Sequence, residues 1–345
     1  MNKVEKAVLL AHGDGGKLTH QLIQELFLAY FGHPALQELS DAAVITMTRD
    51  QGPAPDGLPL VVTTDSFVID PIFFPGGDIG KLAVCGTVND LAVSGARPLY
   101  LTCGFIIEEG FPLRDLEAVV QSMAEWARIA GAAIVAGDTK VVPRGHADKI
   151  FINTTGIGLL LPQAQLGYQR VGPGDKVLVS GSIGDHGLCV LSQRQGLGLQ
   201  IGVESDCCPL TDLARDLIAQ VPGIKLMRDP TRGGLATTLK EIALASQVDI
   251  QVEESELPIR REVRGGAEIL GLDPLYLANE GKLVAIVAPD QASQALDIMN
   301  QYSPAQEAAI IGQVLLGRGN VYLKTAIGGT KYLDLLVGAQ LPRIC

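Results

Sequence analysis

The sequence predicts an α+β protein with two domains, and three observations carry this prediction. Its 345 residues exceed what one hydrophobic core usually serves. Strand and helix patterns follow one another in mixed rather than alternating order, which is typical of a sheet covered by helices. Hydrophobic residues make up 47%, enough for well-filled cores, while 40 glycines and only 5% aromatic residues indicate many tight turns. We therefore expect two compact units rather than a disordered chain.

The first half is predicted to form one mixed sheet with two long helices. Apolar residues at helical spacing, among them Leu116, Val119 and Met123, identify the clearer of these helices. A Pro- and Gly-rich connection at 50–59 joins two strands as a hairpin. The expected elements are a helix at 19–31, strands at 42–47 and 60–69, a helix at 79–94, a strand at 99–107, a helix at 113–130, and strands at 133–136 and 150–160.

The second half begins after a boundary at 162–175, which contains Pro and Gly and few apolar runs. The expected elements are strands at 176–180, 249–252 and 282–287, and helices at 185–195, 210–220 and 233–246. The pattern weakens from about 317 onward, and Gly328-Gly329 separates a final segment. We accordingly divide the chain into an N-terminal glycine-rich segment with its helix at 1–40, domains at 41–161 and 170–316, and a C-terminal tail at 317–345.

Charge and cysteine content exclude several classes of protein. A net charge of −11 argues against a nucleic-acid or anionic-membrane partner, because both need a basic footprint. The 6 cysteines include no C-x-x-C pair, so neither a disulfide framework nor a zinc or redox motif is indicated. No apolar stretch approaches a membrane span, and the N-terminal apolar run is too short for a signal peptide. These features predict a cytoplasmic protein.

A glycine-rich opening, His12-Gly13-Asp14-Gly15-Gly16, precedes the first helix. It lacks the third glycine of G-x-G-x-x-G, and Lys17 follows too soon after Gly13 for a P-loop. A glycine cluster without such spacing is more often a turn than a phosphate cradle, and both interpretations stay open here.

Aspartates beside predicted strand and helix ends are more informative. Asp is a poor strand former, so a carboxylate within Val-Val-Thr-Thr-Asp-Ser needs a reason. Turn or cap chemistry explains any single one of them. The alternative is a set of hard oxygen ligands for Mg²⁺ that holds phosphate groups. Because most of them lie in the first domain beside small residues, we favour metal binding. The set is Asp41, Asp65, Asp90, Asp138 and Asp229.

Three further residues carry reactive side chains in unusual places. Cys345 ends the chain, too close to the terminus for a prenylation motif. A terminal thiol beyond a Gly-Gly hinge is expected to be exposed and mobile, and a swinging thiol is one use for it. Lys140 follows Asp138 among apolar neighbours, and Glu280 lies in a turn ahead of a strand. A solvated surface charge is the plain interpretation of both.

Taken together, these residues resemble the HypE family of hydrogenase maturation factors, in the superfamily of aminoimidazole ribonucleotide synthetase, selenophosphate synthetase and thiamine-monophosphate kinase. The resemblance covers nearly the full length, and its most specific motifs are Phe-Phe-Pro-Gly-Gly at 73–77, Gly-Asp-Thr-Lys-Val-Val at 137–142 and Pro-Arg-Ile-Cys at 342–345. It implies a two-domain aminoimidazole ribonucleotide synthetase-like fold with an ATP-binding first domain. It also implies an N-terminal mixed sheet that forms a dimer barrel, a C-terminal α+β domain and a flexible C-terminal tail.

The resemblance further implies a reaction with named parts. A carbamoyl group on Cys345, supplied by the carbamoyltransferase HypF, is phosphorylated by ATP and dehydrated to a thiocyanate. The cyanide then passes to iron on the HypC–HypD complex. Glu280 is the implied base and Lys140 the implied cation that stabilises developing charge. The implied Mg²⁺ ligands are the five aspartates above. The implied ATP-binding residues are His12, Gly13, Gly15, Gly16, Asp65, Asn89, Gly137, Asp138 and Thr139.

Two alternatives make different predictions. Selenophosphate synthetases offer a Cys or selenocysteine in the segment that corresponds to 12–16, where this chain has none, and a kinase of free small molecules has no need of a terminal Cys. A non-catalytic nucleotide-binding scaffold predicts no ATP turnover at all. One departure concerns the metal: relatives in the wider superfamily often carry two adjacent acidic residues where this chain has Ser40-Asp41.

Overall fold

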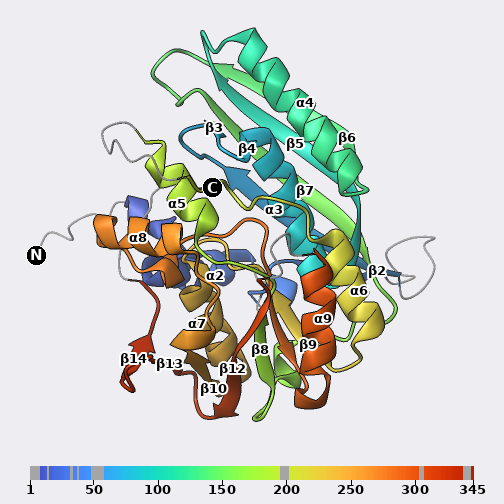
Figure 1. The fold of residues 1–345 in the computed structure, drawn as a ribbon. Coiled ribbons are helices and arrows are strands. Elements are labelled where there is room, and N and C mark those ends of the chain that lie inside the picture. Colours follow the sequence, from blue (N-terminus) through green and yellow to red (C-terminus); the bar gives the residue numbers. More distant parts are fainter. Residues whose placement is uncertain are drawn as a thin grey trace, which may run out of the picture.

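The computed structural model of the chain describes residues 8–13, 15–31, 34–36, 39–47, 58–194, 202–302, 307–336 and 343–345. They form two α+β units that lie against each other (Figure 1), so the predicted two-domain fold class is confirmed. Most of the connection predicted at 50–59 lies outside the described residues. Within the described ranges, no helix combines the length and the apolar character needed to cross a membrane.

The first unit is a 5-stranded sheet in the order β1-β2-β7-β5-β6. Neighbouring strands are antiparallel except β5 and β6, which run parallel because a helix connects them. The strands are β1 (Ala43–Met47), β2 (Leu58–Phe67), β5 (Ala96–Glu108), β6 (Ala133–Val142) and β7 (Ile150–Leu160), with the short pair β3 (Phe73–Phe74) and β4 (Gly77–Asp78). Helices α3 (Ile79–Val93) and α4 (Leu113–Ile129) cover one face only (Figure 1). Every helix and strand predicted here from 79 to 160 is confirmed.

Helix α3 is buried along nearly its whole length because it lies between the first sheet and the second unit. Asp78 caps its N-terminus by accepting a hydrogen bond from Gly80 N at 2.7 Å. Gly80 has to be glycine, since a Cβ there would lie 2.4 Å from the Val119 carbonyl oxygen of α4. This close packing holds α3, the helix that carries Asn89 and Asp90, against α4.

Strand β6 is longer than the strand predicted at 133–136, and this changes the setting of the motif at 137–142. Asp138 lies opposite Gly104 of β5 in the regular ladder, so it does not close a loop as turn chemistry predicts. Because β6 is the edge strand of its sheet, its residues are exposed in the single chain.

The second unit is a 7-stranded sheet in the order β14-β13-β10-β12-β8-β11-β9. Its strands are β8 (Lys176–Val179), β9 (Ile224–Arg228), β10 (Val248–Glu253), β11 (Val284–Val287), β12 (Ala309–Leu316), β13 (Val321–Lys324) and β14 (Thr330–Leu333). Its helices are α5 (Asp185–Ser192), α6 (Thr211–Gln220), α7 (Gly234–Ser246), α8 (Arg261–Leu270) and α9 (Ala292–Tyr302). The elements predicted in this half are confirmed, but the prediction missed β9, α8, α9, β12, β13 and β14. In β9, Lys225 and Arg228 interrupt the apolar pattern because they pair with buried carboxylates.

The tail predicted to start at 317 differs from the structure. Strands β13 and β14 belong to the second sheet, because Val321 and Leu333 are buried in its core. Gly328, at a φ of 87°, lies in the turn between these strands, where Thr325 N donates to the Gly329 carbonyl at 2.9 Å. The Gly-Gly pair is therefore a hairpin turn and not a hinge.

The helix predicted at 19–31 is present as three successive segments, α1 (Lys17–Leu22), the π-helical η2 (Ile23–Phe27) and α2 (Leu28–Phe31). Two apolar residues of this helix, Leu26 and Phe27, are 45% and 41% exposed, and no described residue of α1, η2 or α2 is buried. Backbone contact anchors the helix instead, since Lys17 N donates to the Leu336 carbonyl at 3.0 Å.

Candidate active site

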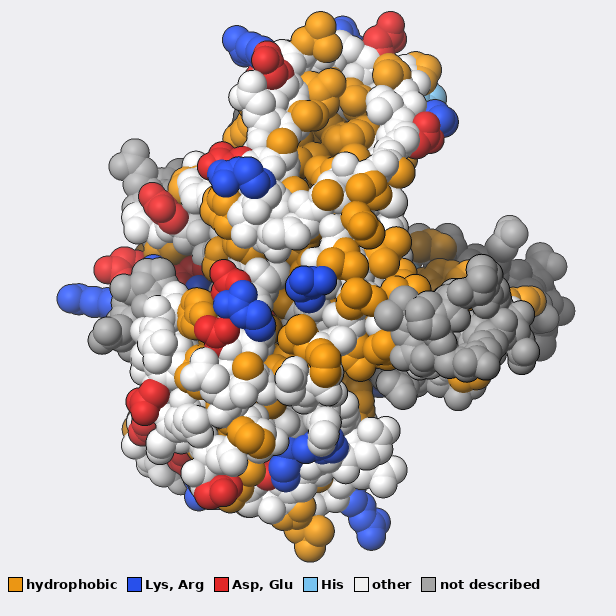
Figure 2. All heavy atoms as spheres, turned by 90° about the vertical axis from the view of Figure 1, so that its right-hand side faces the viewer, with side chains coloured by type: hydrophobic (Ala, Val, Ile, Leu, Met, Phe, Trp, Pro, Cys, Tyr) orange, Lys and Arg blue, Asp and Glu red, His pale blue; other side chains and the backbone are white. Residues whose placement is uncertain are grey.

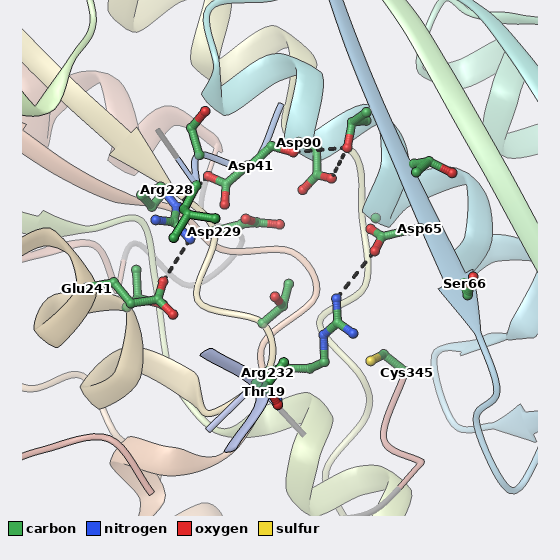
Figure 3. A pocket seen from close by; sticks show the side chains of 18 of the residues that line it. Thr19, Asp41, Asp65, Ser66, Asp90, Arg228, Asp229, Arg232, Glu241 and Cys345 are labelled. Atoms are coloured by element: carbon green, nitrogen blue, oxygen red, sulfur yellow. Dashed lines mark hydrogen bonds and ion pairs between the residues drawn. The ribbon is translucent and has the colours of Figure 1, made fainter. Parts of the chain in front are cut away.

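A cavity of about 520 Å³ opens between the two units (Figure 3). Its lining comes from the N-terminal helix, β2, α3, the segment after β9, helix α7 and the C-terminal residue. This volume lies in the range of small-molecule sites. The cavity thus gathers residues from both ends of the chain.

Three carboxylates meet in this cavity. Ligand atoms of Asp41, Asp90 and Asp229 all lie within 4.8 Å of one another. Asp41 lies two residues before β1, Asp90 lies in the last turn of α3, and Asp229 directly follows β9. Burial raises the pKa of Asp41 to about 6 and of Asp229 to about 8, and it raises the pKa of Asp90 well above its usual range. Crowded carboxylates of this kind fit a hard cation such as Mg²⁺, which offsets their repulsion.

A buried arginine flanks the carboxylate cluster. Arg228 Nε lies 2.5 Å from Asp41 Oδ2, and its Nη2 donates to Glu241 Oε2 at 3.0 Å. The other oxygen of Glu241 lies 3.0 Å from His20 Nε2, and this contact raises the pKa of His20. The N-terminal helix is thereby linked to the cluster. Sequence analysis missed Glu241 and His20, because nothing along the chain indicates that they face each other.

The terminal thiol lies at the other side of the same cavity. Figure 3 shows Arg232 pointing toward Asp65, with the Cys345 sulfur beside it. Arg232 Nη2 lies 3.4 Å from Asp65 Oδ1. Burial raises the pKa of the Cys345 thiol to about 12, while Arg232 acts in the opposite direction. The thiol is half-buried and therefore less exposed than the sequence predicts.

Glu280 is a buried carboxyl in the cavity wall, 3% exposed, and its Oε1 has no hydrogen-bond partner among the described residues. Burial raises its pKa well above the usual range, and Asp229 acts in the same direction. Its backbone is fixed at both ends: Glu280 N donates to Asp206 Oδ1 at 3.0 Å, and Asn89 Nδ2 donates to the Glu280 carbonyl at 3.2 Å. An unpartnered carboxyl aimed into a cavity is free to accept a proton from a substrate.

Other residues implied by the resemblance lie elsewhere in the single chain. Asn89 does not line the cavity; its side chain joins the two units, accepting from Leu210 N at 2.7 Å and donating to the Cys208 carbonyl at 3.0 Å. Of the glycine-rich opening, Gly15 lines the cavity and Gly16 is buried at the start of α1. His12 and Gly13 lie outside the lining.

The motif at 137–140 is exposed on β6, away from the cavity of its own chain. Lys140 Nζ lies 2.8 Å from the Asp138 carboxylate, and this hydrogen bond lowers the pKa of Asp138. Gly137 and Thr139 share the same exposed strand. The structure therefore brings together Asp41, Asp65, Asp90, Asp229, Glu280 and Cys345, and leaves this motif apart.

Comparison with known proteins agrees with this geometry. Residues 39–160 match the N-terminal domain and residues 172–324 the C-terminal domain of AIR synthase related proteins. The carbamoyl dehydratase HypE of Azotobacter vinelandii is 49% identical over 340 residues, which cover 98% of this chain and 97% of that protein. The chain belongs to the HypE family. A solved HypE in complex with ATP is 51% identical, with a TM-score of 0.80, over 98% of this chain and 100% of that one. HypE in a HypE–HypF complex is 46% identical, with a TM-score of 0.83, over 91% and 99%.

The carboxylate cluster leads to a first prediction. Asp229→Asn keeps the size of the side chain and removes its charge. Loss of a group that only supports a metal ligand lowers metal affinity roughly ten- to hundredfold, so we expect loss of this direct ligand to lower Mg²⁺ affinity at least as much. The melting temperature without Mg²⁺ should hold or rise, because the substitution relieves repulsion. Asp212→Asn is the matched change outside the cavity, because Asp212 is exposed on α6 and pairs with Arg215. Calorimetric titration of both variants with Mg²⁺ and ATP compares them. Unchanged Mg²⁺ affinity in Asp229→Asn, together with a lower melting temperature, would show a purely structural carboxylate.

Proposed function

We propose that this chain is an ATP-dependent carbamoyl dehydratase that acts on its own C-terminal cysteine. The observation that carries the proposal is the position of Cys345. Its thiol lies in one cavity with a cluster of three aspartates and with Glu280, whose Oε1 has no hydrogen-bond partner among the described residues. Family membership supports the same activity, since the relative from Azotobacter vinelandii bears the name carbamoyl dehydratase.

The reaction converts a thiocarbamate into a thiocyanate: R–S–C(=O)–NH₂ + ATP gives R–S–C≡N + ADP + phosphate. The carbonyl oxygen attacks the γ-phosphorus and ADP leaves, which turns a poor leaving group into a phosphate ester. The nitrogen then gives up its protons, the C≡N bond forms, and phosphate departs with the original carbonyl oxygen. One proton stays with the phosphate and the other passes to solvent.

Each step has a candidate residue in the cavity. Mg²⁺ held by the three-aspartate cluster would neutralise part of the triphosphate charge. Glu280 would accept the nitrogen proton in its ionised form, because its Oε1 has no hydrogen-bond partner among the described residues, and its raised pKa makes that form more basic than an exposed carboxylate. Arg232, whose pKa is itself raised by the neighbouring Cys345 and by Asp65, supplies positive charge where the carbamoyl oxygen develops negative charge. Sequence analysis gave that electrostatic role to Lys140 alone.

Lys140 can serve a site only if a second copy of the chain delivers it, and the first sheet favours such pairing. Among the described residues, no helix covers the sheet face opposite α3 and α4, and Figure 2 shows a band of hydrophobic side chains on the side of the molecule that it views. Exposed apolar residues on this sheet face include Tyr100 and Ile106 of β5, which pair with Ile157 and Phe151 of β7. An exposed face of this kind next to the unpaired edge of β6 marks an association surface. We therefore propose a homodimer through this sheet.

Mixing two variants tests whether Lys140 acts across the dimer. Lys140→Ala and Glu280→Gln chains should each fail to dehydrate the carbamoyl group alone. After subunit exchange, their equimolar mixture should recover about a quarter of the parent turnover, because half of randomly paired dimers are mixed and each holds one complete site. Light scattering verifies the dimer. A mixture that forms mixed dimers and stays inactive contradicts delivery of Lys140 from the second copy.

Partners and compartment follow from the same proposal. A carbamoyltransferase of the HypF type would load Cys345, which is supported by the solved HypE–HypF complex of a relative. The HypC–HypD complex is the expected acceptor of the cyanide. We place the reaction in the cytoplasm because all of the cysteines are unpaired, as a catalytic thiol requires.

Intact mass of the protein tests the activity. The chain is incubated with a HypF-type partner, carbamoyl phosphate and either ATP or an analogue whose β–γ bond cannot be cleaved, in parallel samples. We expect the mass of one carbamoyl group to be gained, followed by loss of one water only where ATP can be cleaved. A carbamoylated chain that stays intact with ATP would identify a nucleotide-binding scaffold instead.

A further inference from the structure

The last three residues are held between the two units by backbone hydrogen bonds. Val68 N donates to the Cys345 carbonyl at 3.0 Å, and Asp70 N donates to the Arg343 carbonyl at 3.3 Å. Arg194 Nη2 also donates to the Arg343 carbonyl, at 2.8 Å. The chain end is thus seated in one defined register beside the segment that follows β2.

A buried histidine holds the remaining carbonyl of this segment. His186, on α5, is 0% exposed, and its Nε2 lies 2.9 Å from the Ile344 carbonyl oxygen. Because a carbonyl only accepts, Nε2 carries the hydrogen. The neutral ring then accepts at Nδ1 from the Ser205 hydroxyl at 2.8 Å. The edge-on ring of Phe74, at a centroid distance of 5.5 Å, and the burial that lowers the pKa of His186 agree with a neutral imidazole.

The segment that orients this imidazole also holds the proposed base. Ser205 contacts His186, and the next residue, Asp206, accepts from Glu280 N at 3.0 Å. Asp206 is itself fixed by Lys282, whose Nζ lies 3.3 Å from Oδ2. Gly281 has to be glycine here, since a Cβ would lie 1.9 Å from the Asp206 carbonyl oxygen. Two adjacent residues therefore set the position of both the chain end and Glu280.

We propose that His186 is a positioning residue for dehydration, which seats the modified cysteine against Glu280 by holding the Ile344 carbonyl. The proposal rests on the function proposed above. Ile344 immediately precedes Cys345, so this hydrogen bond fixes the peptide group from which the reacting side chain extends. A misplacement of about 1 Å in such an arrangement is enough to slow a reaction on the order of 10²-fold.

The two halves of the reaction place opposite demands on this contact. Loading by a carbamoyltransferase requires Cys345 to leave its half-buried seat and enter the active site of another protein. Dehydration requires Cys345 to return to the cavity that holds Glu280. Weakening the His186 contact should therefore slow only the second step, whereas a general structural defect would slow both.

Three variants separate these cases. His186→Phe keeps the ring and its contact with Phe74 but removes both hydrogen bonds. His186→Gln restores a donor for the Ile344 carbonyl and serves as the conservative rescue. Ser205→Ala loosens the imidazole without touching the chain end. Ser255→Ala is the matched control, since Ser255 is exposed and its hydroxyl donates to Glu256 Oε1 at 3.1 Å.

The rate at which iodoacetamide alkylates Cys345 in the folded dimer without ATP measures how firmly the chain end is held, separately from catalysis. The extent of alkylation is determined on the C-terminal peptide. We expect His186→Phe to speed alkylation, to leave carbamoyl loading unchanged or faster, and to slow single-turnover dehydration roughly 10- to 100-fold. Ser205→Ala should lie between this variant and the parent, His186→Gln should recover part of the loss, and Ser255→Ala should match the parent.

Two results would overturn the positioning role: a parent-like alkylation rate in His186→Phe, or equal losses in loading and dehydration. If instead the parent protein seats its tail but never dehydrates it, the proposed function fails, while the alkylation series still reports on the His186 contact.

Discussion

Cys345→Ala is expected to leave the fold and Mg²⁺–ATP binding intact and to abolish every covalent change on the chain. In the proposed reaction one sulfur atom carries both the carbamoyl and the cyano group, and this atom lies in the cavity with Glu280 and Arg232. Loss of the nucleophile removes the substrate itself, so no residual turnover should remain. Intact mass after incubation with the HypF-type partner, carbamoyl phosphate and ATP measures the outcome.

The matched control is Cys103→Ala, which removes a half-buried cysteine from β5 of the first sheet. This variant should gain the carbamoyl group and lose water as the parent does. A carbamoyl or cyano mass on Cys345→Ala would assign the carrier to another side chain and refute the proposed role of the chain end.

Glu280→Gln is expected to bind ATP and accept the carbamoyl group, yet to dehydrate it on the order of 10²–10⁴ times more slowly. The amide keeps the shape of the side chain but cannot take up the nitrogen proton. The parent carboxyl suits this task because its Oε1 has no hydrogen-bond partner among the described residues. The measurement is single-turnover dehydration of chains that were carbamoylated beforehand.

Glu241→Gln provides the comparison for Glu280→Gln within the same cavity. Both of its oxygens are already engaged, by Arg228 and by His20, so it is not available as a base. We expect a smaller effect on dehydration, through weaker support of Asp41. Equal rates for Glu280→Gln and the parent would remove Glu280 from the chemistry, and loss of carbamoyl loading would assign it to partner contact.

The sequence predicted much of the fold because the first unit has strong local patterns. The periodicity of α4 and the alternation of β5 and β7 are visible without tertiary context. Aspartates beside strand and helix ends led to the prediction of a metal site, and three of them form the cluster of Asp41, Asp90 and Asp229. Aspartate is a poor strand former and its buried charge is costly without a partner, so a carboxylate at such a position indicates a bound cation or an ion pair.

The rest depended on contacts between distant segments. The Gly-Asp-Thr-Lys stretch has the composition of a turn, but pairing with β5 keeps it in strand β6. Gly328-Gly329 has the composition of a hinge, but pairing of β13 with β14 makes it a hairpin turn. Arg232 and His186 owe their roles to the chain end, which lies far from them in sequence and beside them in the structure.

In the proposed reaction the carbamoyl oxygen on Cys345 leaves as part of the inorganic phosphate. Following that oxygen with a heavy isotope tests this step directly. Chains are loaded with a carbamoyl group whose carbonyl carries heavy oxygen, purified, and given unlabelled ATP for one turnover. We expect heavy oxygen in the inorganic phosphate, in step with formation of the thiocyanate on Cys345. Thiocyanate formed with unlabelled phosphate and heavy oxygen in the water would contradict the proposed reaction.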